Sequence, residues 1–233
     1  MHYIKKFDAV VVISDQLKKI YECKLKSISR VYNGIDITYR PDKNDPSIIA
    51  QINKFRDLNY KIIGSYAYLT RIKGLEQLIK VLEKRKDLAV VIIGEGEAKN
   101  ELIELSRTLN VIDRTLFLDY LPTPYNYLSL FDVYAMCSRS EGFGLAAVEA
   151  TLMQTPVVCS NISIFKEIFD DTKVSFFELD NISSLLESIN IAISTIGKLK
   201  AKVALNYSLN NFSGYKMASN YLDIYSNLLN GKI

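Results

Sequence analysis

The chain has 233 residues, of which 48% are hydrophobic and 24% are charged, and its formal net charge is +3 at pH 7. This composition is ordinary for a soluble globular protein of one large domain, or of one domain with an appendage, and the small charge gives no reason to expect a nucleic-acid partner. The single histidine, His2, argues against a histidine-based zinc site and a Ser-His-Asp triad, and the three cysteines have no C-x-x-C spacing.

The sequence predicts a cytoplasmic protein. No apolar run reaches the roughly 18 residues that span a bilayer, and the N-terminus lacks the long apolar core and the cleavage site of a signal peptide. Cys137 and Cys159 lie in apolar runs, as reduced core residues of a cytosolic protein do. The lysine pairs at positions 5–6 and 18–19 favour either peripheral contact with an anionic membrane surface or solvated helix faces.

Short apolar, β-rich runs alternate along the chain with amphipathic stretches. We expect strands at Ala9–Ser14, Arg30–Tyr32, Lys61–Ala67, Ala89–Gly94, Thr115–Leu118, Val133–Ser138, Pro156–Ser160 and Val174–Phe177. Their nearly continuous apolar content is typical of parallel strands covered on both faces. Between them, leucines recur at helical spacing, as in Leu75–Leu82 and Leu102–Leu109. The pattern predicts an α/β fold with a doubly wound parallel sheet.

Two segments at the ends of the chain fall outside this sheet. A strand and a helix within Ala9–Leu25 precede a turn at Tyr32–Asp36, which leads into an irregular stretch through Pro46. One strand and one helix cannot bury a core alone, so we expect them to dock onto something else. The last helix, Tyr215–Leu229, carries tyrosine and leucine side chains on one broad face.

The loop Ser138–Leu145 is the strongest candidate site, because ligands of open parallel sheets bind at loops that leave the carboxyl ends of strands. Gly142 and Gly144 let a ligand approach the backbone, and N–H groups at the start of the following helix attract an anion. Glu141 and Glu149 could accept hydrogen bonds from different hydroxyls of one extended ligand, or they could be a helix-dipole partner and a surface residue. Glu149 lies inside an apolar run, where an unpaired carboxylate is costly, and this favours the ligand role.

The loop Tyr68–Gly74 is a second candidate. Arg71 and Lys73 come just before the start of a helix, where the helix dipole disfavours exposed cations by about 0.3–1 kcal/mol each. A bound diphosphate would reverse that sign. The alternative is two exposed basic residues whose cost is screened by salt.

A third loop, Gly94–Glu97, begins like a dinucleotide-binding fingerprint. Lys99 stands where the third glycine should be, and the acidic side chains would repel a pyrophosphate, so we interpret the loop as a plain turn. The sequence contains no G-x-x-x-x-G-K-[ST] motif, which excludes a P-loop.

Together, these features resemble the family-4 retaining glycosyltransferases with the GT-B fold, over nearly the whole chain. Glu141–Ala150 resembles that family's E-x7-E motif, and Thr70–Ile79 resembles its K-G phosphate loop with the helix that follows. Val31–Asp36 resembles the P-N-G-V-D entry into the donor-binding domain. Further matching positions are Asp132, Val133, Thr155–Val158, Glu167, Ile168, Phe212 and Ser213.

The resemblance implies a role for each matched residue. Glu149 would hold the ribose hydroxyls of a nucleotide, Glu141 would hold hydroxyls of the transferred sugar, and Lys73 would neutralise the diphosphate of the leaving group. Backbone contacts with the sugar and the distal phosphate would come from Gly142, Phe143, Gly144 and Leu145. Family members need no divalent metal for this reaction, so we expect no metal and no cofactor besides the nucleoside-diphosphate sugar substrate.

The chain also departs from the family pattern. Tyr68 stands where the family usually has an arginine, so Arg71 would have to reach the phosphates instead, and Gln154 replaces a glycine. A complete member has a whole acceptor-binding N-terminal domain. The resemblance therefore divides this chain into a remnant of that domain at 1–30, a Rossmann-like nucleotide-sugar-binding domain at 31–212 and a crossover helix at 213–233.

Three functions remain open at this point. The first is the donor half of a glycosyltransferase of the hexosyltransferase type, which transfers a glycosyl group with retention to a glycan or lipid-linked acceptor and whose acceptor domain is missing or separately encoded. The second is a truncated, non-catalytic fragment that binds a nucleotide sugar. The third is a nucleotide-sugar epimerase of the GT-B fold, against which the E-x7-E spacing and the Lys73-Gly74 loop argue. By family resemblance, the expected setting is bacterial surface-polysaccharide assembly.

Overall fold

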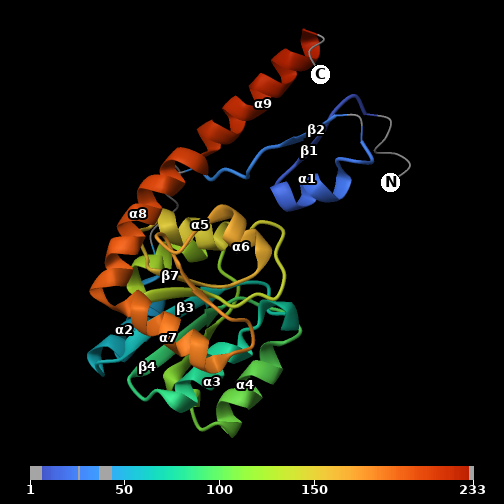
Figure 1. Ribbon diagram of the computed structural model, residues 1–233. Helices are drawn as coiled ribbons and strands as arrows, with labels where there is room; N and C mark the ends of the chain where they lie inside the picture. Colours follow the sequence, from blue (N-terminus) through green and yellow to red (C-terminus); the bar gives the residue numbers. More distant parts are fainter. Residues whose placement is uncertain (1–6, 26, 37–43, 231–233) are drawn as a thin grey trace.

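Six parallel strands form the main sheet of the computed structural model, which describes residues 7–25, 27–36 and 44–230 (Figure 1). The strands are β3 (Lys61–Tyr66), β4 (Leu88–Ile93), β5 (Thr115–Leu118), β6 (Val133–Met136), β7 (Val157–Ser160) and β8 (Ser175–Phe177). Their spatial order is β5-β4-β3-β6-β7-β8. The first strand of this sheet, β3, therefore lies at its centre. Strands β4 and β5 extend the sheet toward one edge, and β6 returns to the centre and pairs with β3. The loops leaving β3 and β6 diverge there, which is where open α/β sheets form their ligand crevice.

The sheet is buried on both faces because alternate residues of its strands pack into two different cores. In β4, one core receives Leu88, Val90 and Ile92, and the other receives Ala89, Val91 and Ile93. The first core is covered by α3 (Glu76–Lys84), α4 (Lys99–Thr108) and α7 (Ile182–Ile193). The second is covered by α2 (Pro46–Asp57), the 3₁₀ helix η4 (Pro124–Leu130), α5 (Leu145–Leu152) and α6 (Ser163–Ile168). The long helix α8 (Thr195–Asn211) packs against α5 and α7. This arrangement confirms the predicted doubly wound α/β fold.

A small unit lies beyond one end of the main sheet (Figure 1). Its two strands, β1 (Val10–Val12) and β2 (Ile28–Arg30), pair in a separate parallel sheet and are connected by α1 (Asp15–Tyr21). The Glu167 carboxylate accepts hydrogen bonds from the backbone N–H groups of Asp15 and Gln16, at 2.6 and 3.0 Å. Glu167 lies on α6, so this contact joins the small unit to the main domain.

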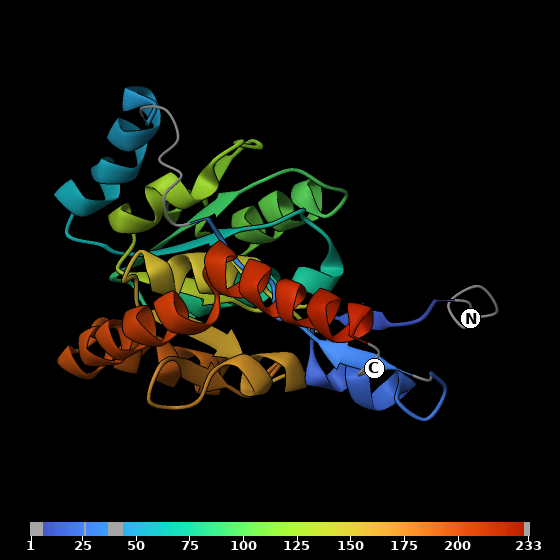
Figure 2. The same ribbon diagram turned by 90° about the horizontal axis from the view of Figure 1, so that it is seen from above.

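The two connections between the main domain and the outlying elements run side by side. The Ile35 N–H donates to the Phe212 carbonyl, and the Gly214 N–H donates to the Ile35 carbonyl, both at 2.8 Å. From this crossing, α9 (Gly214–Leu229) runs toward the small unit (Figure 2). Its exposed large apolar side chains are Tyr215, Leu222, Tyr225 and Leu229.

All eight predicted strands are present, but the second was misplaced, because it covers Ile28–Arg30 rather than Arg30–Tyr32. Helices α2, α6, α7 and α8 are additional to those expected. Residues 37–43 of the predicted irregular stretch lie outside the described residues, and its last residue, Pro46, is the first residue of α2. The Asp45 carboxylate accepts from the Ser47 N–H at 2.8 Å, and proline suits the first helical turn.

Other expectations concern single positions. Cys137 and Cys159 are free and buried, as predicted. Lys18 and Lys19 lie in the last turn of α1, whereas His2 and the lysine pair at positions 5–6 lie outside the described residues. None of the described helices is long and apolar enough to cross a membrane. The domain boundaries after residues 30 and 212 stay predictions.

Candidate functional site

A cleft of about 510 Å³ opens where the loops leaving β3 and β6 diverge. Lys73, Glu141 and Glu149, which the sequence places in three different segments, all line this cleft. Three further predicted residues in its wall are Phe143, Gly144 and Leu145. The remaining wall includes Ile13, Asn33, Tyr66, Pro122, Tyr125 and Ser138. The structure therefore collects six of the eight predicted site residues around one cavity.

Helix α5 begins at the wall of the cleft. Its N-cap, Gly144, has a φ of 90°, in the left-handed region that favours glycine. A Cβ at this position would lie 2.4 Å from the Phe165 ring. Gly144 has no side chain to cap this helix, and among the described residues no side-chain acceptor is seen for the N–H groups of Leu145 and Ala146. A helix start of this kind stabilises an anion.

Lys73 and Glu141 form an ion pair in the cleft. Lys73 Nζ lies 2.6 Å from Glu141 Oε1, and the Ser138 hydroxyl donates to the same oxygen at 2.7 Å. The side chains of Lys73 and Glu141 are only 25% and 11% exposed, so water screens the pair weakly. Lys73 is delivered by the 3₁₀ helix η2 (Arg71–Lys73), which follows β3. The cleft thus offers an ammonium group and a carboxylate that already contact each other.

Glu149, on α5, meets Tyr66, at the end of β3, in the wall of the cleft. The Tyr66 hydroxyl donates a hydrogen bond to Glu149 Oε2. Burial raises the pKa of the Glu149 carboxyl above its ordinary value, and the hydrogen bond from Tyr66 opposes that rise. Burial also holds the pKa of Tyr66 well above its ordinary value, so its hydroxyl remains a donor. The Glu149 carboxylate is therefore partnered and half-buried, and Glu149 lines the cavity.

Arg71 and Gly142 are not part of the cleft wall. Arg71 Nε bonds Glu101 Oε2 at 3.1 Å, and Arg71 lines a second cavity, of about 630 Å³, between α3 and α4. Successive residues of a 3₁₀ helix point in different directions, which is why Arg71 and Lys73 diverge. Gly142 lies at the junction with the small unit, where a Cβ would be 3.8 Å from Ile13 Cδ1. The structure gives Arg71 an acidic partner instead of a place beside Lys73.

Three wall residues were not singled out from the sequence. Tyr66 is the last residue of β3, so the rule that sites form at carboxyl ends of strands would have indicated it. Ser138 follows β6 closely, within the candidate loop, and its hydroxyl is revealed as a partner only by the fold. Tyr125 lies in η4, between β5 and β6, and no local pattern connects it with the other two.

This constellation suits a ligand with a diphosphate and several hydroxyls. The Lys73 ammonium and the α5 start can stabilise phosphate charge, and Glu141 and Glu149 can accept from hydroxyl groups. Within residues 7–25, 27–36 and 44–230, no group of three or more His, Cys, Asp and Glu side chains could hold a metal ion. That this site works without a metal stays a prediction.

Known proteins share both the sequence pattern and the fold. The profile of the family "Glycosyl transferases group 1" matches residues 48–204. The chain is 34% identical over 229 residues to the O-antigen biosynthesis glycosyltransferase WclY of Escherichia coli, covering 95% of this chain and 62% of that protein. It is 29% identical over 178 residues to an N-acetylgalactosaminyltransferase of Campylobacter jejuni that acts on a diphospho-undecaprenol-linked sugar, covering 75% of this chain and 47% of that protein. The chain thus spans less than two thirds of these relatives.

Solved structures of other proteins share this fold. The structure of Anabaena HepE in complex with UDP superposes with a TM-score of 0.85 at 20% identity, covering 97% of this chain and 66% of HepE. A glycosyltransferase from Rickettsia africae superposes with a TM-score of 0.82 at 22% identity, covering 98% of this chain and 66% of the other. The sheet order, the profile match and these superpositions agree: the chain belongs to the glycosyl transferases group 1 family and has the fold of GT-B glycosyltransferases.

Proposed function

We propose that this chain binds a nucleoside-diphosphate sugar and forms the donor side of a retaining, hexosyltransferase-type glycosyltransferase. The observation that carries the proposal is the convergence of Lys73, Glu141 and Glu149 on one cleft at the topological switch point of the sheet. A nucleotide-sugar epimerase is the less favoured function, because the chain belongs to a family of glycosyltransferases.

In this proposal, each side chain meets one part of the donor. Lys73 and the start of α5 contact the diphosphate and stabilise the charge that develops as the nucleoside diphosphate leaves. Glu149, oriented by Tyr66, accepts hydrogen bonds from the ribose hydroxyls. Glu141 accepts from hydroxyls of the sugar, next to the anomeric carbon. Because Lys73 and the N–H groups at the start of α5 balance the charge of the diphosphate in this scheme, donor binding needs no divalent metal.

A neighbouring cavity gives the nucleobase a place. This cavity of about 510 Å³ shares Tyr66, Ala67, Pro122 and Pro124 with the cleft, and its wall also contains Tyr68 and Tyr120. Both of these tyrosines are 66% exposed, so their rings are available to a planar base. The UDP complex of the similarly folded HepE makes uracil the first base to test.

Transfer also needs an acceptor site. The chain spans 62% of WclY. We propose that the acceptor, a glycan or a lipid-linked sugar, is bound by a region that corresponds to the remaining part of such relatives. That region belongs either to the same polypeptide or to another one. In this proposal, the exposed apolar side chains of α9 and the small unit contact that part. A second candidate is a chain that binds the donor but does not transfer the sugar by itself. Both candidates place the protein on the cytoplasmic side of the membrane, where nucleotide sugars are available, with peripheral contact to lipid.

The test is a calorimetric and thermal-shift screen of the purified chain against UDP-, GDP- and ADP-sugars, each with magnesium and with EDTA. We expect one nucleotide series to bind, with the same affinity under both conditions. Absence of binding to every nucleotide sugar would falsify the donor-site assignment. A stronger signal with magnesium would refute its metal independence. Hydrolysis or transfer assays with and without a complete acceptor domain then separate the half-enzyme from the non-catalytic candidate.

A further inference from the structure

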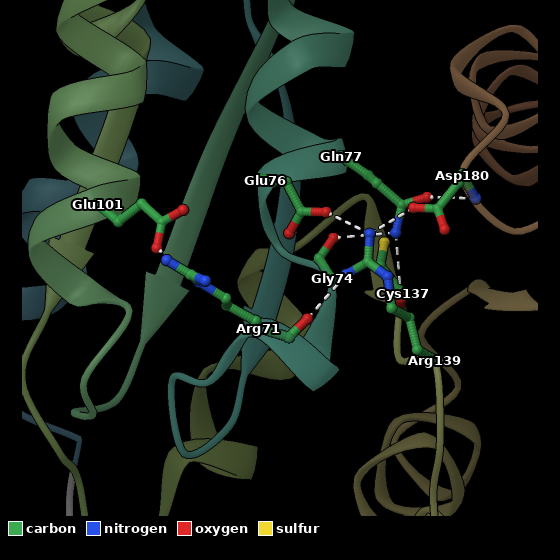
Figure 3. A network of polar contacts seen from close by, with 8 residues as sticks. All are labelled: Arg71, Gly74, Glu76, Gln77, Glu101, Cys137, Arg139 and Asp180. Carbon is green, nitrogen blue, oxygen red and sulfur yellow. Dashed lines mark hydrogen bonds and ion pairs between the residues drawn. The ribbon is translucent and has the colours of Figure 1, made fainter.

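Gln77 is a buried polar residue of α3 that lies behind the cleft and does not line it. Its side-chain Nε2 donates to the Gly74 carbonyl at 3.1 Å and to the Cys137 carbonyl at 3.2 Å, and its Oε1 accepts from the Asp180 N–H at 2.9 Å. Gln77 is 1% exposed, so water does not replace these bonds. The three partners belong to three different loops, which follow β3, β6 and β8 (Figure 3).

Arg139 joins the same three loops from the solvent side. Its backbone N–H donates to the Ile72 carbonyl and its Nη1 donates to the Arg71 carbonyl, both at 2.7 Å. Its Nη2 bonds Glu76 Oε1 at 2.6 Å and also bonds the Asp180 carboxylate. Figure 3 shows the Arg139 guanidinium between these two acids.

The partners of these two residues flank Lys73 and Glu141. The carbonyls of Arg71, Ile72 and Gly74, on both sides of Lys73, accept from Arg139 or Gln77. On the other side, Arg139 itself belongs to the loop that carries Glu141, and Cys137 begins that loop.

Gly74 brings the two loops into direct contact. Its φ is 62°, and a Cβ at this position would lie 2.3 Å from the Cys137 carbonyl. The backbones of the Lys73 loop and the Glu141 loop therefore lie close together. The Gln77 and Arg139 side chains connect them, and neither of these residues lines the cleft.

We propose that Gln77 and Arg139 are positioning residues, which lock the Lys73 loop to the Glu141 loop so that the ammonium group lies where a diphosphate binds. This inference rests on the proposed function. It predicts that loss of either residue affects phosphate recognition specifically, because the displaced element is the backbone on either side of Lys73. A side chain displaced by even 1 Å loses much of its contribution to binding.

A purely structural role is the alternative, and Arg114 supplies a matched control. Arg114 is 5% exposed and donates to the carbonyls of Leu82, Arg85 and Leu88, at 2.8–3.0 Å. It is therefore a buried polar hub like Gln77, but it lies before β5, at the opposite end of the sheet from the cleft. For the partly exposed Arg139, the matched control is Arg85, which bonds Asp87 at 2.7 Å on the surface.

The experiment compares the affinities of UDP and uridine, by calorimetry, for the wild type and for Gln77→Met, Arg139→Gln, Arg114→Met and Arg85→Gln. If the donor screen selects another base, GDP with guanosine or ADP with adenosine replaces this pair. We expect Gln77→Met and Arg139→Gln to weaken nucleoside-diphosphate binding by about tenfold, as is common for partners that orient a binding group. Nucleoside binding changes less than about twofold, and the two control variants bind as the wild type does.

A double-mutant cycle adds a readout that simple destabilisation would not produce. If Gln77 acts through Lys73, the variant Lys73→Ala/Gln77→Met binds the nucleoside diphosphate no more weakly than Lys73→Ala alone. Additive losses overturn the proposal, as do equal losses for the nucleoside and its diphosphate, or folded Gln77 and Arg139 variants with wild-type affinity. If Gln77→Met does not fold, the cycle is made with Arg139→Gln. If the wild type binds no nucleoside diphosphate, the proposed function itself is refuted. If the wild type and the variants bind equally well, only the positioning role of Gln77 and Arg139 is refuted.

Discussion

Lys73 Nζ lies 2.6 Å from Glu141 Oε1, although the two residues are 68 positions apart in the chain. Each therefore satisfies the charge of the other while no diphosphate is bound, and the Ser138 hydroxyl shares the same carboxylate oxygen. A donor that enters the cleft would insert its phosphate oxygens beside the ammonium group and offer its sugar hydroxyls to the carboxylate. The ion pair is then exchanged for contacts with the ligand rather than lost.

Lys73→Ala should weaken binding of a nucleoside diphosphate by about 1.5–3 kcal/mol, the usual range for a hydrogen bond to a charged group, and should leave nucleoside binding nearly unchanged. The reason is that the ammonium group contacts phosphate and not base or ribose. Calorimetric titrations with UDP and uridine measure both affinities. Lys80→Ala is the control, because Lys80 is exposed on α3, the helix that follows the Lys73 loop, and lines the other cavity. Equal losses for the two ligands would show that Lys73 does not touch phosphate.

Glu149→Ala should weaken nucleotide-sugar binding by roughly 1–3 kcal/mol, because hydroxyls that lose their acceptor in a half-buried site stay unsatisfied. The same change leaves the Tyr66 hydroxyl without its carboxylate partner. Calorimetry with the ribonucleotide and its 2′-deoxy analogue measures the effect, and the deoxy analogue should lose less. Glu104→Ala, on the exposed face of α4, is the control. Unchanged affinity in Glu149→Ala would remove this residue from the binding site.

Arg71→Ala should change nucleoside-diphosphate affinity by less than about 0.5 kcal/mol, as substitutions at exposed positions usually do. Its side chain is 83% exposed and bonds Glu101 outside the cleft. Titration beside Lys73→Ala gives a direct comparison of the two cations of this loop. A loss as large as that of Lys73→Ala would mean that Arg71 swings into the cleft when the ligand binds, as the sequence alone suggests.

Glu149→Gln should raise the free energy of unfolding at neutral pH. Burial raises the pKa of Glu149 in the folded protein above its value in the unfolded chain, so the ionised carboxylate destabilises the fold. This cost is fully present above the folded-state pKa and disappears as the pH falls below the unfolded-state pKa. Urea denaturation from pH 7 down to pH 4 should therefore show the variant and the wild type converging toward acid. A constant difference across that range, or the same trend in Glu104→Gln, would contradict the assignment.

Local sequence patterns were sufficient to predict the sheet and to single out Glu141 and Glu149, which line the cleft. The continuous apolar content of segments such as Ala89–Gly94 reflects burial on both faces, and β4 is buried along its whole length. The apolar neighbours of Glu149 predicted that its carboxylate holds a ligand. In the structure the carboxylate accepts from the Tyr66 hydroxyl, and its ligand role stays a prediction. The helix α2 was missed because the Asp45-Pro46 pair is compatible with both a turn and a helix start.

The sequence by itself determined the α/β class, the positions of seven of the eight predicted strands along the chain and the loops that carry the charged residues, because these depend on periodicity and on near neighbours. Only the tertiary structure decided which side chains meet. It turns Lys73 toward Glu141 and Arg71 toward Glu101, and it places the Gln77 amide between three loops. Such pairings join residues far apart in the chain, and they depend on the order of the strands and on the direction in which each short helix points.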